Sequence, residues 1–238
     1  ALMGPNGNGK STLLSAIMGN PKYQVTEGSI YLDGQNVLEM SVDERSKAGI
    51  FLGMQYPQEI PGVVTSDFLR AALNAHQEKP VSLFKFIKEL DKNIADLKMD
   101  ENLAHRYLNE GFSGGEKKRN EILQMKLLKP KFALLDEIDS GLDVDALKIV
   151  SEAINDMKSD SFGCVMVSHY ERLFELVPPS HVHILVDGKI VLSGGQELID
   201  RIDKEGYRWV KELGFDFETE EDKQPIVLGS CGNKVKAK

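Results

Sequence analysis

A glycine-rich stretch close to the first residue constrains this chain more than any other feature. Residues 4–12 read Gly-Pro-Asn-Gly-Asn-Gly-Lys-Ser-Thr, which is a glycine, four residues, a second glycine, a lysine and a hydroxyl residue. Such glycines let successive backbone N–H groups curl inward around phosphate oxygens, and the following helix points its positive end at the same anion. We therefore expect a phosphate-binding loop followed by a helix that ends at Gly19.

The residue types of this loop predict a nucleotide and a divalent cation as ligands. Lys10 is expected to pair with the β- and γ-phosphates, and the Ser11 hydroxyl to ligate Mg²⁺, so ATP and Mg²⁺ are the expected cofactors. The predicted nucleotide-binding residues are Gly4, Asn6, Gly7, Asn8, Gly9, Lys10, Ser11 and Thr12. A strand should lead into such a loop, but the three residues before it are too few for the sequence to indicate one.

Composition excludes several classes of protein. The 238 residues, 41% of them hydrophobic, are enough for one large domain or two small ones. No run approaches the ~18 apolar residues of a membrane span, and the net charge of −8 argues against a nucleic-acid partner. Cys164 and Cys231 are too few for a disulfide framework or a cluster site. We expect a cytoplasmic α/β protein with no direct membrane insertion.

Hydrophobic periodicity predicts alternating strands and helices. The apolar run at 51–54 is strand-like, those at 132–135 and 164–167 are typical of buried parallel strands, and 144–157 has helical spacing. The pairs Asp33-Gly34 and Asp187-Gly188 predict hairpin turns, hence antiparallel β elements. The expected organisation is a core lobe from 1–56 and 112–214, a helical subdomain over 57–111, and a tail over 215–238 that carries an acidic run at 218–222.

Two carboxylates follow the strand predicted at 132–135. Asp136, at the strand end, is placed to hold Mg²⁺ through water. Glu137 is placed to polarise a water molecule for attack on the γ-phosphorus. A second glycine-rich turn, Ser113-Gly114-Gly115-Glu116, opens a helix predicted to reach Leu128, and its N-terminus offers a second anion site.

Taken together, these motifs resemble those of one known family. With Gln55 after a strand, Ser140-Gly141-Leu142-Asp143, and Val167-Ser168-His169, they follow the order found in ATP-binding cassette (ABC) ATPases, and the resemblance runs from residue 1 to about 214. It implies an α/β cassette with a RecA-like phosphate-loop core lobe, a helical subdomain and antiparallel β elements. It also implies that Gln55 senses Mg²⁺ and the γ-phosphate and that His169 contacts the γ-phosphate. The expected catalytic residues are Glu137, His169 and Gln55, and the expected Mg²⁺ residues are Ser11, Gln55 and Asp136.

The resemblance further implies a homodimer that forms on ATP binding. The turn Ser113, Gly114, Gly115 and Glu116 is similar to the family's signature, which caps the ATP held by the partner's phosphate loop, with Phe112 and Glu116 in place of the commoner Leu and Gln. Asp143 resembles the acid of the D-loop. Because the chain has one phosphate loop and one signature, a complete site requires two chains.

Several stretches resemble the SufC ATPases of iron–sulfur cluster assembly more than the ATPase subunits of transporters. They are residues 55–63, 111–125, 136–148 and 205–209. This resemblance implies SufB/SufD-type scaffold subunits as partners, whose rearrangement ATP would drive. The alternatives are a transporter ATPase subunit and a non-hydrolysing assembly component.

The resemblance also implies strands and an adenine-stacking aromatic side chain ahead of the loop, which this sequence does not contain. We expect a truncated sequence; the alternative is a short form that binds nucleotide weakly.

Overall fold

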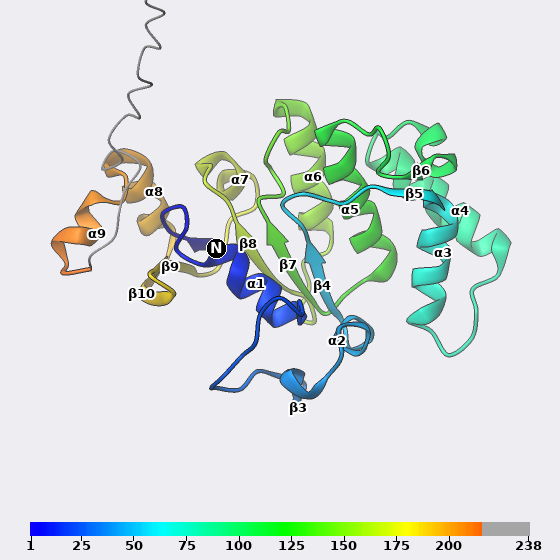
Figure 1. Ribbon diagram of the computed structural model, residues 1–238. Helices are drawn as coiled ribbons and strands as arrows, with labels where there is room; N and C mark the ends of the chain where they lie inside the picture. Colours follow the sequence, from blue (N-terminus) through cyan, green and yellow to red (C-terminus); the bar gives the residue numbers. More distant parts are fainter. Residues whose placement is uncertain (216–238) are drawn as a thin grey trace, which may run out of the picture.

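The computed structural model describes residues 1–215, and these form an α/β fold around a six-stranded sheet (Figure 1). The strand order is β10-β9-β1-β8-β7-β4, with β10 antiparallel to β9 and the other neighbours parallel. These strands are β1 (Leu2–Met3), β4 (Ile50–Gly53), β7 (Phe132–Asp136), β8 (Gly163–Val167), β9 (Val182–Val186) and β10 (Lys189–Gly194). The α/β class expected from the sequence is confirmed.

The strand that should lead into the phosphate loop is present. Leu2 and Met3 form β1, which pairs with β8 on one side and β9 on the other, so it lies inside the sheet. Both side chains are buried, at 4% and 2% exposure. A two-residue strand has no readable periodicity, and only its neighbours identify it.

Helices cover both faces of the sheet, which is why the central strands are apolar throughout. Along β7, Ala133 and Leu135 pack into one buried cluster and Leu134 into another, because successive side chains point to opposite faces. The face of the sheet on which Leu134 lies is covered by α1 (Lys10–Met18), and α2 (Val42–Ala48) packs beside α1 and against β4. The face on which Leu135 lies is covered by α5 (Gly114–Leu128), α6 (Val144–Asp156) and α7 (Glu171–Leu176).

The segment between β4 and α5 contains strands as well as the expected helices. The helices are α3 (Thr65–Ala75) and α4 (Leu83–Asp96), which are separated around Pro80. Two short strands, β5 (Ile60–Val64) and β6 (Tyr107–Leu108), pair antiparallel on either side of α3, α4 and the 3₁₀ turn η2 (Glu101–His105). Pro61 and Gly62 disfavour a helix in β5, and the β-branched residues around them favour extended backbone.

Both hairpin turns predicted from Asp-Gly pairs are confirmed. Asp33 and Gly34 join β2 (Tyr31–Leu32) to β3 (Gln35–Asn36), and Asp187 and Gly188 join β9 to β10. All four residues have positive φ, as the two-residue hairpin turn requires. The remaining elements are the 3₁₀ turn η1 (Val37–Glu39) and helices α8 (Gln196–Glu205) and α9 (Arg208–Glu212).

Gly19 ends α1 in the left-handed conformation, as expected. Gly49 ends α2 in the same way, and Ser41 with Glu44 forms a capping box at the start of α2. The acidic run at 218–222, most of the predicted tail and Cys231 lie outside the described residues. None of the described helices has the length and apolar character needed to span a bilayer.

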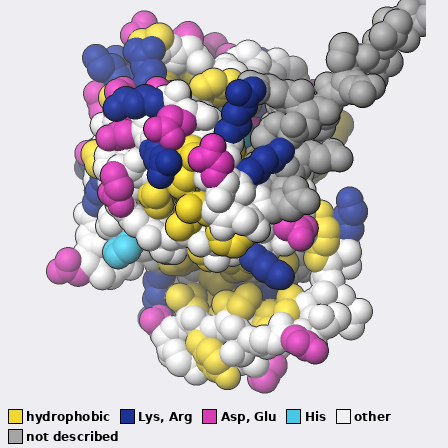
Figure 2. All heavy atoms as spheres, turned by 90° about the vertical axis from the view of Figure 1, so that its left-hand side faces the viewer, with side chains coloured by type: hydrophobic (Ala, Val, Ile, Leu, Met, Phe, Trp, Pro, Cys, Tyr) yellow, Lys and Arg dark blue, Asp and Glu magenta, His cyan; other side chains and the backbone are white. Residues whose placement is uncertain are grey.

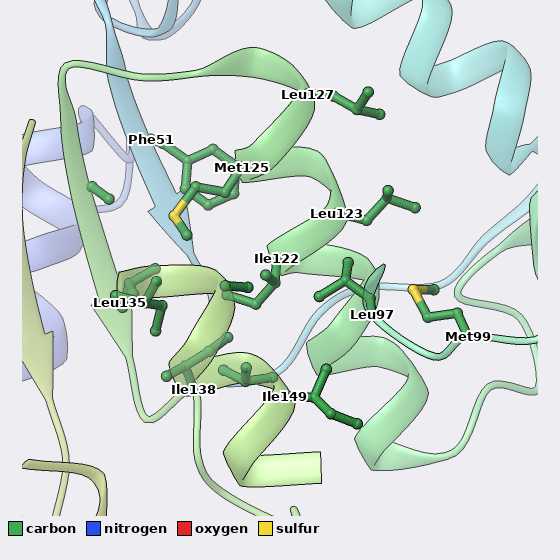
Figure 3. Close-up of a cluster of buried hydrophobic side chains, with 14 of the residues drawn as sticks. Phe51, Leu97, Met99, Ile122, Leu123, Met125, Leu127, Leu135, Ile138 and Ile149 are labelled. Atoms are coloured by element: carbon green, nitrogen blue, oxygen red, sulfur yellow. The ribbon is translucent and has the colours of Figure 1, made fainter. Parts of the chain in front are cut away.

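The largest buried cluster lies where α5 meets the sheet (Figure 3). Ile122 and Met125 of α5 face Phe51 of β4 and Leu135 of β7, while Leu123 points toward Leu97 at the end of α4. The helix therefore contacts the sheet on one side and the 57–111 segment on the other.

We predict that Leu123→Ala lowers the free energy of unfolding by about 2–5 kcal/mol, because Leu123 is 1% exposed and its removal leaves a cavity. Leu83→Ala is the matched control: the same change at the start of α4, where the side chain is 52% exposed, should cost less than about 0.5 kcal/mol. Denaturant unfolding of both variants tests the prediction, and equal losses would contradict it.

Candidate active site

The candidate site lies where four parallel strands end at one edge of the sheet. The phosphate loop follows β1, Gln55 follows β4, Glu137 follows β7, and His169 follows β8. In the order β1-β8-β7-β4 these strands are neighbours, so their carboxyl ends lie side by side. Residues far apart in the sequence are therefore brought together at this edge.

The phosphate loop is held in place at both ends by the C-terminal part of the chain. The Gly4 N–H donates to the Tyr207 hydroxyl at 2.9 Å, and a Cβ on Gly4 would lie 2.1 Å from the Leu185 carbonyl oxygen. At the other end, Asn8 Oδ1 accepts from the Asp187 N–H at 2.8 Å and the Asn8 carbonyl accepts from the Gly188 N–H at 3.1 Å. The β9–β10 turn therefore supports the loop.

Lys10 folds back into the loop. Its ammonium donates to the carbonyl oxygens of Gly4 at 2.6 Å and Pro5 at 3.0 Å, and the residue is 6% exposed. Burial lowers the pKa of Lys10, while the nearby carboxylates of Glu137 and Asp136 act in the opposite direction. A buried ammonium among carbonyl groups is ready to exchange these neutral acceptors for phosphate oxygens.

The remaining predicted loop residues take positions that suit a phosphate cradle. Gly7 and Gly9 have positive φ, and Gly9 precedes the first turn of α1, so the loop curls as its glycines predict. Asn6, Gly7 and Thr12 are exposed, and Asn8 Nδ2 donates to the Pro5 and Asn6 carbonyls at 3.2 Å each. The amides at the start of α1 add the positive end of a helix.

Ser11 and Asp136 are joined across the loop. A hydrogen bond from Ser11 lowers the pKa of Asp136, but burial, the larger effect, raises it. Asp136 is 5% exposed, and within the described residues its Oδ1 has no hydrogen-bond partner. A buried carboxylate oxygen without a partner, beside a hydroxyl, is a suitable donor set for a hard cation such as Mg²⁺.

Glu137 lies between Gln55 and His169. Gln55 Nε2 donates to Glu137 Oε2 at 2.6 Å, and His169 Nε2 lies 3.4 Å from Glu137 Oε1. Glu137 itself has φ of +47°, which turns the chain out of β7 directly after Asp136 and lets the two adjacent carboxylates make different contacts. The three residues expected to be catalytic are thus brought together.

The loops after β7 and β8 are also tied to one another. Ser168 Oγ donates to Asp139 Oδ2 at 2.5 Å. Burial lowers the pKa of His169 and Lys10 adds to the effect, while the Glu137 carboxylate acts in the opposite direction. The lowered pKa favours the neutral form of the imidazole at pH 7.

The signature turn lies elsewhere in the chain. Ser113 and Glu116 form a capping box at the start of α5, with the Ser113 N–H donating to Glu116 Oε2 at 2.7 Å. In Figure 1, α5 lies on the other side of β8 and β7 from the phosphate loop. Gly114 and Gly115 form the first turn of α5. Asp143 caps α6, accepting from the Ala146 N–H at 2.7 Å.

Two further residues contact the site, and the sequence analysis assigned them no role. Lys118 and Glu121 of α5 are 3% and 5% exposed, and both bond the backbone of Met54, the residue before Gln55. Residues 118, 121, 122 and 125 share one helix face. Two charged residues on a face that continues with apolar residues are the sequence signal from which their burial could have been predicted.

The sequence of this chain is similar to the sequence model of one known family and to the sequences of several known proteins. The sequence model of the ABC transporter family matches residues 1–140. The chain is 61% identical over 222 residues to vegetative protein 296 of Bacillus subtilis, covering 92% of this chain and 85% of that one. It is 56% identical to a probable ABC transporter ATP-binding protein of Streptococcus pyogenes, covering 92% and 87% of the two chains. It is 48% identical to a probable ATP-dependent transporter of Synechocystis, covering 89% and 84%.

Solved structures agree on the fold. An ATP-binding cassette solved as a dimer, in a post-hydrolysis state bound to ADP and Pi, aligns with a TM-score of 0.71 over 82% of this chain and 83% of that one. At 22% identity, this similarity describes the fold alone.

The buried Glu121 should make stability depend on pH. Burial raises its pKa to about 7, so between about pH 4.5 and 7 the folded state holds a proton that the unfolded state has lost. Stability is therefore lost as the pH rises through this window, by about 3 kcal/mol. Glu121→Gln removes this ionisation. We predict that, in denaturant unfolding, the variant gains stability relative to wild type between pH 4.5 and 7.5; a constant difference would contradict this.

Proposed function

The chain belongs to the ABC transporter family of ATP-binding cassettes, and we propose that it is an Mg²⁺-dependent ATPase subunit that dimerises on binding ATP. We propose further that it drives a conformational change in a SufB/SufD-type scaffold for iron–sulfur cluster assembly. The contact of Glu137 with both Gln55 and His169, beside the phosphate loop, is the observation that carries the ATPase proposal.

In this proposal, phosphate oxygens of ATP replace backbone carbonyl groups as the hydrogen-bond partners of Lys10. The ammonium would leave the carbonyls of Gly4 and Pro5 for the β- and γ-phosphates, and the loop amides would surround the β-phosphate. The anchors at Tyr207 and Asp187 support this, because a loop held at both ends keeps its amides oriented without the ligand.

The residues present suit Mg²⁺. Ser11, Asp136 and Gln55 supply a hydroxyl, a carboxylate and an amide oxygen, all of the hard-donor type that Mg²⁺ prefers. Asp136 Oδ1, buried and without a partner in residues 1–215, supports this assignment. When bound, the cation would neutralise charge on the β- and γ-phosphate oxygens.

Hydrolysis follows from the position of Glu137. A water oxygen would bond to the γ-phosphorus while the bond to the β–γ bridging oxygen breaks, and ADP would leave with that oxygen. The carboxylate of Glu137 would orient the water and take its proton. His169, with its neutral N–H, would donate to a γ-phosphate oxygen. Gln55 would sense the γ-phosphate through its hydrogen bond to the Glu137 carboxylate.

Two chains would form each complete site. The capping box at Ser113 orders the first turn of α5, so its free amides are ready to meet an anion from outside the chain. Ser113, Gly114, Gly115 and Glu116 would then cap the ATP of the partner, with Asp143 at the same interface.

We predict that Glu137→Gln lowers the ATPase turnover number at least about 100-fold, because the amide cannot take a proton from water. The amide can still accept the hydrogen bond of a water and does not alter the phosphate loop, so ATP-induced dimers should persist and accumulate. Phosphate release and light scattering with ATP and Mg²⁺ measure the two effects. Asp145→Asn, an exposed acid in the first turn of α6, is the charge-matched control. Unchanged turnover in Glu137→Gln would refute the role of this carboxylate.

The proposal of a scaffold partner rests on the sequence resemblance and on exposed apolar residues. The resemblance of residues 55–63, 111–125, 136–148 and 205–209 to SufC ATPases favours soluble scaffold subunits in the cytoplasm. We propose that exposed apolar residues in and next to the paired strands β5 and β6 form the docking surface, which we call the β5–β6 patch. These residues are Tyr56, Ile60, Val63 and Tyr107. Because the chain has two cysteines, a cluster would be held by the partner.

The second candidate function is the ATPase subunit of a transporter, favoured by the names of the relatives in Streptococcus pyogenes and Synechocystis. A third possibility, a component that binds no ATP, is tested by titration with a labelled ATP analogue.

We predict that affinity purification of the chain from cytosol recovers soluble scaffold subunits, and that Tyr56→Ser with Ile60→Ser reduces recovery at least about tenfold because it removes apolar contact area. Leu83→Ser, at an exposed position outside the β5–β6 patch, should have no effect. Recovery of an integral membrane protein would instead select the transporter alternative.

A further inference from the structure

Helix α5 buries two opposite charges close to the candidate site. Lys118 and Glu121 lie one turn before Ile122 and Met125 in α5. In Figure 3, Ile122 and Met125 mark the face of α5 that packs against β4 and β7. Their side chains are 4% and 7% exposed, and their charged atoms are 3.9 Å apart. Burying two charges costs more than their mutual attraction returns unless further hydrogen bonds hold them, so their partners are informative.

Both charges act on one residue, Met54. Lys118 Nζ donates to the Met54 carbonyl oxygen at 2.6 Å, and Glu121 Oε1 accepts from the Met54 N–H at 2.7 Å. The ladder between β4 and β7 ends at the pair Gly53 and Leu135, so the backbone of Met54 is held by side chains of α5 beyond the end of that pairing. The bond from the Lys118 ammonium is charge-assisted and therefore strong, and Glu121 Oε1 can accept the second bond whether or not the carboxyl group holds a proton on its other oxygen, so this peptide is held at both ends.

The next residue is Gln55, whose amide donates to Glu137 at 2.6 Å. Gln55 lies beyond the last paired residue of β4, and its side chain must reach the carboxylate at the end of β7. Whether the Gln55 side chain can reach Glu137 depends on the position at which the backbone of Met54 is held. The clamp of Lys118 and Glu121 on Met54 therefore sets the position of Gln55 relative to Glu137.

We propose that Glu121 is a positioning residue: by holding the Met54 N–H, together with Lys118 on the carbonyl, it ties the Gln55–Glu137 contact to helix α5. Because α5 begins at Ser113, a displacement of that helix end would move Gln55 as well. This inference rests on the proposed ATPase function for its effect on turnover, whereas the clamp itself is independent of activity.

The first test is kinetic and uses the full chain. Glu121→Ala removes the acceptor and leaves the Met54 N–H without it, so the turnover number should fall about tenfold or more, the effect of leaving one buried donor unsatisfied. The dissociation constant for ATP should stay within about twofold, since the phosphate loop is untouched. Glu121→Gln retains an acceptor oxygen and should restore most of the turnover. Asn93→Ala controls for loss of stability, because Asn93 is a buried polar residue of α4 whose side-chain amide donates to the Glu89 carbonyl within the same helix.

The second test does not depend on catalysis. Amide hydrogen exchange in the nucleotide-free chain should show faster exchange at Met54 in Glu121→Ala than in wild type, and wild-type exchange in Glu121→Gln and Asn93→Ala. If wild type hydrolyses ATP and Glu121→Ala turns over equally fast, the inference is wrong while the proposed function stands. If wild type does not hydrolyse ATP, the proposed function fails, and unchanged exchange at Met54 in Glu121→Ala would overturn the clamp as well.

Discussion

Four neighbouring strands, β1, β8, β7 and β4, run parallel and so end at the same edge of the sheet, and the candidate site depends on this constraint. Each strand is followed by a turn that carries one polar group: the phosphate loop, His169, Glu137 or Gln55. Parallel pairing needs long crossovers, which accounts for the wide spacing of these groups along the sequence. Helices on both faces bury the strands, and the rigid edge that results fixes where the polar groups lie.

Most polar groups of the site bond one another. Lys10 bonds the carbonyls of its own loop, and Glu137 is shared by Gln55 and His169. Both sets of contacts are ones that a triphosphate and a water molecule would replace. Asp136 differs, since its Oδ1 is buried and has no hydrogen-bond partner in the described part of the chain. Side chains that these contacts already hold in place would lose less entropy when a ligand binds.

Buried polar contacts link the site to more distant elements. Tyr207, just ahead of α9, holds the first glycine of the phosphate loop, and Glu121 of α5 holds the backbone before Gln55. Each pairs a side chain with a main-chain amide far away in the sequence. Such contacts leave little trace in local patterns, because a tyrosine near the end of a helix or a glutamate within one is ordinarily at the surface.

The sequence by itself determined the phosphate loop, the alternation of strands and helices, both hairpin turns and the helix end at Gly19, because each depends on local backbone geometry or on periodicity. It also placed Gln55, Glu137 and His169 directly after strands. Only the tertiary structure decided that Leu2 and Met3 form an inner strand, that β5 and β6 pair across the helices between them, and that Glu137 bridges Gln55 and His169. It alone also placed Lys118 and Glu121 on Met54. The physical reason is the same in each case: strand pairing and buried hydrogen bonds are made between residues distant in sequence, and their partners are chosen by packing.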